Sequence, residues 1–232
     1  MKKLVYILLA VFALTSCREE PDLSELSSDF LVFTNYDKST EFSNMKNYYM
    51  PDSVLVIGLG AIGLVAAMIL KTMGAGTVIG ADRSKLRLEQ VRKTGLLDVI
   101  DTSEPAWMEQ VKEMTAKDGV DIVIEATGAP PVLKDAMAAA RTGGKIVVPS
   151  VYFGGIDGFE PLPIMRKELT IIGSKGPAPQ LKTDGTSAVV EKVVQMKDDL
   201  RKLISVYEYK DALQAFADAR SGAAIKAVIQ FS

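Results

Sequence analysis

The stretch that decides the fold is residues 54–63, which read VLVIGLGAIG. Its first four residues are apolar without interruption, which is typical of a parallel strand that is buried on both faces. Three glycines follow at Gly58, Gly60 and Gly63, and apolar residues then recur at helical spacing as far as Met73. The stretch therefore predicts a strand, a tight glycine turn and a helix.

Strands alternate with helices along the rest of the chain. We expect further strands at 77–81, 98–102, 120–126, 145–151 and 169–174. Helices are expected at 84–93, at 103–114 with Ser103 as its cap, and at 131–141, which Gly143 and Gly144 would end. Five or six strands with intervening helices predict an α/β fold built on a doubly wound parallel sheet, the Rossmann arrangement.

The glycine spacing is that of a dinucleotide-binding loop, a weak motif that gains weight from the strand before it and the helix after it. Gly58 permits the tight turn, Gly60 lets a pyrophosphate approach the backbone, and Gly63 lets the helix pack against the strand. The backbone amides of Ala61 and Ile62 would face the phosphates at the positive end of the helix dipole.

Asp82 ends the next strand, and it indicates which dinucleotide would bind. A carboxylate there can accept the adenosine-ribose hydroxyls and would repel the 2′-phosphate of NADP, although the adjacent Arg83 could bind that phosphate. We therefore favour NAD over NADP. A methyltransferase, or a Rossmann-like fold without a nucleotide, fits the strand, the spacing and the third glycine less well.

Four stretches carry a resemblance to a known family: 56–63, 80–84, 121–128 and 143–148. From Val54 onward the chain resembles the cofactor domain of zinc-type medium-chain alcohol dehydrogenases, near the sorbitol and threonine dehydrogenases. The resemblance implies that Arg87 reaches the adenosine ribose beside Asp82. It also implies that Thr127, Gly128 and Val151 line the path to the nicotinamide, with plain packing as the alternative for Thr127 and Val151. Dimerisation through the sixth strand, 169–174, is a further implication.

Composition limits the chemistry that this chain can perform. The 232 residues contain no histidine and one cysteine, so a zinc site of the usual Cys/His kind cannot be built from this chain alone. The Tyr-x-x-x-Lys pair of short-chain dehydrogenases is also absent from the sequence. A formal net charge of −2 argues against a nucleic-acid partner, which would require clustered Lys and Arg.

The first residues are typical of an export signal rather than of a fold. Lys2 and Lys3 precede the apolar run 4–14, which is too short to span a bilayer and suits a signal peptide over residues 1–16. Leu14 to Cys17 resembles a bacterial lipobox, which implies lipid attachment at Cys17 and anchoring in the bacterial envelope. An ordinary signal peptide or a hydrophobic strand is the alternative. The dehydrogenase-like part would be cytoplasmic in its family. The N-terminal signal and the dehydrogenase-like part therefore predict different cellular compartments.

We place the cofactor domain at 54–200. The segments on either side of it differ from it in composition and in pattern. Residues 17–53 read as a tether and an aromatic strand, a poorly packed extension that resembles small Bacteroides-type lipoproteins. The chain therefore reads as a fusion near Ser53. Residues 201–232 resemble the family's return to its catalytic domain, and we expect an exposed apolar edge there. One hypothesis is that the strand near Phe30 covers it.

Three functional hypotheses remain open from the sequence. The first is an NAD-dependent alcohol or polyol dehydrogenase whose site is completed by a partner chain. The second, which we favour, is an NAD-binding domain without autonomous catalysis. The third is a membrane-anchored lipoprotein whose Rossmann domain is structural or senses a ligand. Hydride transfer needs a group that polarises the alcohol oxygen and takes its proton, and no such group is evident in the sequence.

Overall fold

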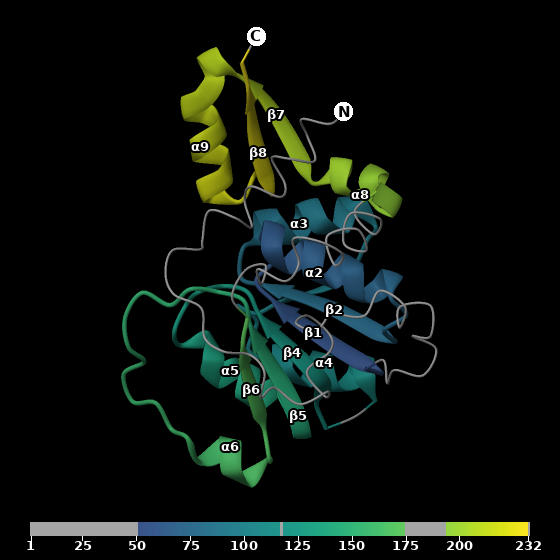
Figure 1. Ribbon diagram of the computed structural model, residues 1–232, viewed down its shortest axis with the longest axis vertical. Coiled ribbons are helices and arrows are strands. Elements are labelled where there is room, and N and C mark those ends of the chain that lie inside the picture. Colours follow the sequence, from purple (N-terminus) through teal and green to yellow (C-terminus); the bar gives the residue numbers. More distant parts are fainter. Residues whose placement is uncertain (1–50, 117, 175–193, 232) are drawn as a thin grey trace, which may run out of the picture. The chain divides into compact units, whose positions relative to one another are not determined.

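Figure 1 shows the computed structural model, which describes residues 51–116, 118–174 and 194–231. The predicted signal peptide, the predicted lipid attachment at Cys17 and the predicted strand near Phe30 all fall outside the described residues. Of the described residues, those in the ranges 51–172 and 194–231 belong to one compact unit.

A six-stranded sheet organises this unit, and its strand order is β3-β2-β1-β4-β5-β6. Adjacent strands from β3 to β5 pair in parallel. The strands are β1 (Ser53–Ile57), β2 (Thr77–Asp82), β3 (Asp98–Asp101), β4 (Val120–Glu125), β5 (Ala140–Val148) and β6 (Thr170–Gly173). This order confirms the predicted doubly wound sheet, and it places the topological switch between β1 and β4.

Helices cover both faces of the sheet (Figure 1). The chain runs outward from β1 to β3 through α2 (Ala61–Thr72) and α3 (Lys85–Thr94), and it returns through α4 (Trp107–Thr115) and α5 (Val132–Ala139). Because parallel crossovers are right-handed, reversing the direction moves the later helices to the opposite face. Trp107 and Val111 of α4 and Met137 of α5 join the strand residues Leu55 and Ile79 in the buried core.

The start of α4 differs from the prediction. Ser103 does not cap this helix, because its backbone N–H and its hydroxyl both donate to Asp101 Oδ1, at 2.9 and 2.5 Å. The helix instead begins at Trp107 with Ala106 as its N-cap residue. The prediction for α3 is confirmed: Ser84 Oγ accepts from Arg87 N–H, and Gly95 ends the helix in the left-handed conformation.

The boundary between α5 and β5 also differs from the prediction. The helix ends at Ala139 and the strand begins at Ala140, so Gly143 and Gly144 lie within β5 rather than at the end of a helix. Ala140 pairs with Val120, and pairing resumes with Lys145 opposite Ile122, which leaves a bulge between them. A short helix, α6 (Leu162–Arg166), precedes β6.

A buried polar cluster joins the amino ends of the central strands. Asp121 Oδ2 accepts from both the backbone N–H and the hydroxyl of Ser53, at 2.9 and 3.0 Å. Its other oxygen accepts from Arg141 Nε at 2.6 Å. The carbonyls of Pro51 and Asp52 accept from Gly76 N–H and Thr77 N–H. These bonds fix the first residues of β1 to β2 and β4.

The C-terminal residues form a second, two-stranded parallel sheet of β7 (Ile204–Glu208) and β8 (Lys226–Gln230). The accompanying helices are α8 (Lys197–Lys202), the 3-10 turn η4 (Tyr209–Asp211) and α9 (Ala212–Ser221). Apolar side chains are exposed here, among them Val206, Leu213 and Phe231.

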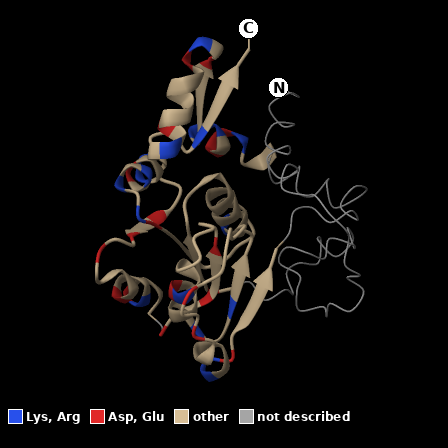
Figure 2. Ribbon diagram, turned by 90° about the vertical axis from the view of Figure 1, so that its left-hand side faces the viewer, with Lys and Arg blue, Asp and Glu red and all other residues tan. Residues whose placement is uncertain are grey.

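Charged side chains of both signs are mixed along the described residues. Figure 2 shows Lys and Arg interspersed with Asp and Glu over the part of the chain that the structure describes. Among these same residues, no helix combines the length and apolarity needed to cross a bilayer.

Candidate dinucleotide-binding site

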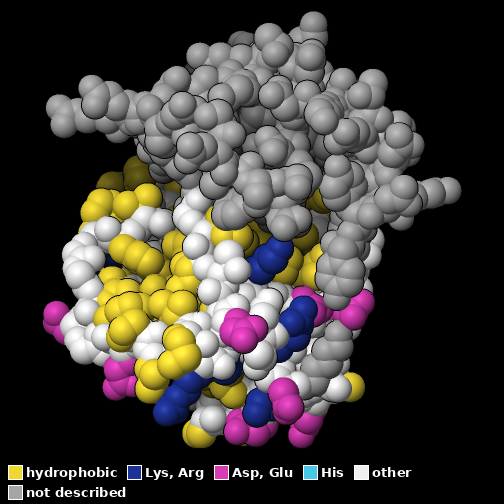
Figure 3. Space-filling model, turned by 60° about the horizontal axis from the view of Figure 1, so that its bottom comes forward, with side chains coloured by type: hydrophobic (Ala, Val, Ile, Leu, Met, Phe, Trp, Pro, Cys, Tyr) yellow, Lys and Arg dark blue, Asp and Glu magenta, His cyan; other side chains and the backbone are white. Residues whose placement is uncertain are grey.

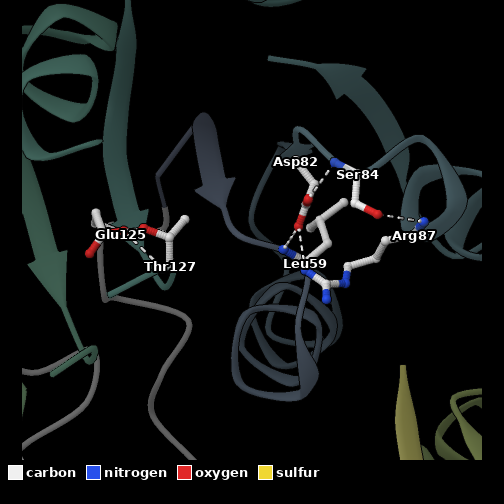
Figure 4. Close-up of polar contacts among 6 residues, drawn as sticks. All are labelled: Leu59, Asp82, Ser84, Arg87, Glu125 and Thr127. Atoms are coloured by element: carbon white, nitrogen blue, oxygen red, sulfur yellow. Dashed lines mark hydrogen bonds and ion pairs between the residues drawn. The ribbon is translucent and has the colours of Figure 1, made fainter. Parts of the chain in front are cut away.

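The predicted site residues meet at the carboxyl edge of the sheet, around the end of β1. In the strand register, Ile57 of β1 lies opposite Ala81 of β2 on one side and opposite Glu125 of β4 on the other. Asp82 and Glu125 therefore flank the glycine loop, one strand to either side (Figure 4). In doubly wound sheets this crevice is where ligands bind.

At two of the three loop glycines, Gly58 and Gly63, the packing of the protein leaves no room for a side chain. Gly58 has a φ of +97°, and a Cβ there would lie 2.8 Å from Thr127 Cγ2. A Cβ on Gly63 would lie 2.0 Å from the carbonyl oxygen of Gly58, so the helix could not keep its position against the turn. Both observations agree with the roles predicted for these glycines.

Gly60 is different, because nothing in the protein requires a glycine there. It has a φ of −72°, which any residue adopts, and a Cβ built on it meets no atom within 4 Å. The space beside it suits a group that approaches the backbone from outside. Gly60 is also the N-cap residue of α2 and supplies no side-chain cap, and Ala61 and Ile62 begin that helix. Their amides lie at the positive end of the helix dipole, where a phosphate is favoured.

Asp82 connects the end of β2 to this loop. Its Oδ2 accepts from Leu59 N–H at 2.8 Å and from Arg87 Nη1 at 3.1 Å, and its Oδ1 accepts from Ser84 N–H at 2.9 Å (Figure 4). A carboxylate offers about four acceptor positions, so roughly one remains for a ribose hydroxyl. The Leu59 side chain is buried against Gly80, where a Cβ would clash with Leu59 Cδ2 at 2.8 Å.

The two arginines near Asp82 differ in their surroundings. Arg87 pairs with Asp82, and its Nε is buried without a hydrogen-bond partner among the described residues. Arg83 is exposed and makes no ion pair within the same residues. An unpaired buried donor is costly, so the Arg87 Nε would gain from an acceptor on a bound ligand.

On the other side of the loop lies a second polar cluster, which sequence reasoning missed. Glu125 is fully buried, and its Oε1 accepts from both the backbone N–H and the hydroxyl of Thr127. Its Oε2 accepts from the hydroxyls of Ser150 and Tyr152. We call Glu125, Thr127, Ser150 and Tyr152 the Glu125 cluster. The sequence did contain a signal, since Glu125 is a charged residue within an otherwise apolar run that begins at Ile122.

The remaining predicted residues lie beside this cluster. Gly128 has a φ of +69°, and a Cβ on it would lie 3.0 Å from the carbonyl oxygen of Val151, so the loops after β4 and β5 meet there. The Val151 side chain is exposed. Burial raises the pKa of the Tyr152 hydroxyl, and the hydrogen bond to Glu125 raises it further, so this hydroxyl stays protonated and donates.

Within the described residues, no group of three or more His, Cys, Asp or Glu side chains is placed to hold a metal ion. The groups gathered at the edge of the sheet are backbone amides, two carboxylates, an arginine and three hydroxyls. This combination of hydrogen-bond donors and acceptors suits the ribose, pyrophosphate and amide groups of a dinucleotide.

A family comparison agrees with this geometry. Residues 61–195 match the model of the zinc-binding dehydrogenase family, and the chain belongs to that family. A sorbitol dehydrogenase from Halalkalibacterium halodurans is 32% identical over 180 residues, which cover 77% of this chain and 51% of that protein. The chain thus spans about half the length of this curated relative.

Solved structures share the fold. Benzyl alcohol dehydrogenase from Acinetobacter calcoaceticus matches with a TM-score of 0.67 at 27% identity, over 83% of this chain and 52% of that one. An alcohol dehydrogenase from Escherichia coli CFT073, solved in complex with NADH, matches with a TM-score of 0.63 at 24% identity. That match covers 82% of this chain and 55% of the other.

Proposed function

We propose that residues 54–174 bind NAD as the cofactor half of an alcohol or polyol dehydrogenase. The observation that carries this proposal is the contact between Asp82 and Leu59 N–H, which holds a carboxylate beside the open space at Gly60. Asp82 would accept an adenosine-ribose hydroxyl, and the first amides of α2 would bind the pyrophosphate. The carboxylate also favours NAD over NADP, because it would repel a 2′-phosphate.

The chemistry that NAD supplies when bound is hydride transfer. This chain's own residues would bind the cofactor and orient it, since the sequence lacks a histidine to relay the alcohol proton. The sorbitol dehydrogenase relative supports a polyol as the substrate class. We propose that this chain alone binds NAD without turnover, and that a partner chain would have to supply substrate and proton-transfer groups for catalysis. A non-catalytic lipoprotein with a structural or ligand-sensing Rossmann domain is the alternative.

Calorimetric titration of the full chain with NAD and with NADP tests the cofactor proposal. We expect NAD to bind the more tightly, and Asp82→Ala to weaken NAD roughly tenfold or more through the lost hydrogen bond to a charged group. Asp98→Ala removes an exposed aspartate from the neighbouring strand and should leave the affinity unchanged. Absence of NAD binding by a folded protein would contradict the proposal.

Two further measurements separate the enzyme from the binding protein. Zinc content and alcohol-dependent NADH formation should both be negligible for this chain alone. Turnover by the isolated chain would instead mean that it contains a complete catalytic site.

A further inference from the structure

The Glu125 cluster has a feature that packing alone does not explain. A fully buried carboxylate, which is costly to desolvate, receives four hydrogen bonds at the ligand-binding edge of the sheet. Two of the donors come from the loop after β5, at Ser150 and Tyr152, some 25 residues further along the chain. Glu125 therefore fixes the positions of hydroxyl groups that belong to a different loop.

Hydrogen-bond direction determines what these hydroxyls can offer a ligand. Each hydroxyl has one hydrogen, and Tyr152 gives its hydrogen to Glu125 at 2.6 Å. Its oxygen can then only accept. Thr127 Oγ1 already accepts from Ala129 N–H at 3.0 Å, and Ser150 lies between Glu125 Oε2 and the Glu125 carbonyl oxygen. The half-buried Tyr152 oxygen, which also neighbours the Ser150 hydroxyl, keeps one further acceptor position for a donor group.

The position of the cluster identifies the part of the ligand that it would meet. Asp82 lies at the end of β2, where a dinucleotide places its adenosine ribose, and the pyrophosphate lies over the start of α2. Glu125 lies on the other side of β1, opposite Ile57. The second half of the dinucleotide, which carries a ribose and the nicotinamide, therefore extends toward this cluster.

We propose that Tyr152, held in place by Glu125, is a specificity-determining residue whose hydroxyl oxygen accepts a hydrogen bond from the second half of the bound dinucleotide. The donor is either the amino group of the nicotinamide carboxamide or a hydroxyl of the adjoining ribose. This inference rests on the proposed NAD-binding function.

Titration with a graded set of ligands tests the role of Tyr152. AMP contains the adenosine half alone, ADP-ribose adds the second phosphate and the second ribose, and NAD⁺ adds the nicotinamide. We expect Tyr152→Phe to weaken NAD⁺ about three- to tenfold, the equivalent of one hydrogen bond, while AMP binding is unchanged. ADP-ribose should be unaffected if the donor is the carboxamide, and weakened as NAD⁺ is if the donor is the ribose. Either pattern supports the proposal.

A matched control is available at Tyr207, whose hydroxyl also donates to a carboxylate, Asp218 Oδ2, at 2.8 Å but in the C-terminal sheet. Tyr207→Phe should change none of the three affinities. Equal effects of Tyr152→Phe on AMP and NAD⁺, or no effect on either, would overturn the proposal. A wild-type chain that binds neither AMP nor NAD⁺ would overturn the proposed function itself.

A second route covers the case in which Tyr152→Phe does not fold. Glu125→Gln removes the charge that orients the hydroxyl and should lower the ratio of NAD⁺ to AMP affinity in the same direction. The wild-type chain also provides a test without substitution. It should bind NAD⁺ more tightly than the analogue whose carboxamide is a carboxylic acid, or bind ADP-ribose more tightly than ADP, which already carries the pyrophosphate. Equal affinities in both comparisons would overturn the proposal.

Discussion

At the scale of single residues, the loop glycines serve two different purposes: Gly60 leaves room for a ligand, and Gly63 is needed for the fold. A methyl group on Gly60 enters open space, whereas one on Gly63 would overlap the Gly58 carbonyl oxygen at 2.0 Å. We expect Gly60→Ala to keep the wild-type free energy of unfolding and to weaken NAD at least tenfold, because the methyl group occupies the approach of the pyrophosphate. We expect Gly63→Ala to lower the free energy of unfolding by about 3 kcal/mol through overpacking.

Urea unfolding and NAD titration of the same two variants check this prediction. A Gly60→Ala variant that binds NAD normally would show that no ligand approaches that position. A Gly63→Ala variant of normal stability would contradict the close contact at the turn.

The sequence was informative about residues whose role follows from local spacing. The pattern predicted the glycine turn and Asp82 at the end of the next strand, and the structure has them there, because neighbouring residues determine both features. Arg87 followed from the family resemblance instead, and the structure pairs it with Asp82. Their part in binding a cofactor stays a prediction. The Glu125 cluster was missed because Tyr152 meets Glu125 only after β4 and β5 have paired. Contacts of that kind depend on tertiary structure and leave no periodic signal in one sequence.

At the scale of an element, the carboxyl end of α5 depends on a lysine from a distant segment. Lys167 Nζ donates to the carbonyls of Met137, Ala138 and Ala140 at 3.0, 2.8 and 2.9 Å, which satisfies helix-end carbonyls that have no partner within the helix. Burial lowers the pKa of this ammonium group, and repulsion from Lys112 adds to the effect.

We expect Lys167→Met to lower the free energy of unfolding by about 1–3 kcal/mol, because three carbonyl oxygens lose a charged donor. Lys134→Met is the control, since Lys134 is an exposed lysine on the same helix. Chemical denaturation of both variants provides the measurement. Equal stability of the two variants would show that water replaces the lysine without cost.

Element boundaries were predicted less well than element types, and the two errors have one cause. Ser103 and the glycine pair after α5 are good local signals for a helix start and a helix end. Asp101 instead takes both donors of Ser103, and pairing of Ala140 with Val120 begins β5 before the glycines. In both places a competing contact with a strand overrides the local preference.

At the scale of the whole molecule, the described surface carries a concentration of apolar side chains in the segment that leads to the edge strand β6. Six large hydrophobic residues between 151 and 171 are exposed: Val151, Phe153, Phe159, Leu162, Met165 and Ile171. Hydrophobic side chains also gather on the face that Figure 3 turns toward the viewer. Exposed apolar groups next to β6, which is the edge strand of the sheet among the described residues, favour association with a second copy of the chain.

We predict that the full chain is a homodimer joined through β6. Ile171→Glu should raise the dimer dissociation constant roughly 100-fold, because it would bury an unpaired charge in the interface. Phe216→Glu alters an exposed aromatic residue on α9 and should leave the dimer intact. Sedimentation equilibrium distinguishes the cases, and a wild-type chain that is monomeric at micromolar concentration would refute the prediction.

The bonds at the start of β1 differ in how much they depend on the identity of the residue that makes them. Pro51 and Asp52 contribute carbonyl oxygens to these bonds, and Ser53 is the first residue whose side chain takes part in them. The two carbonyl contacts would survive a change of residue, since any amino acid supplies the same atom. Substitution of Pro51 or Asp52 would therefore leave the pairing of β1 with β2 unchanged, whereas the side-chain bond to β4 depends on the Ser53 hydroxyl.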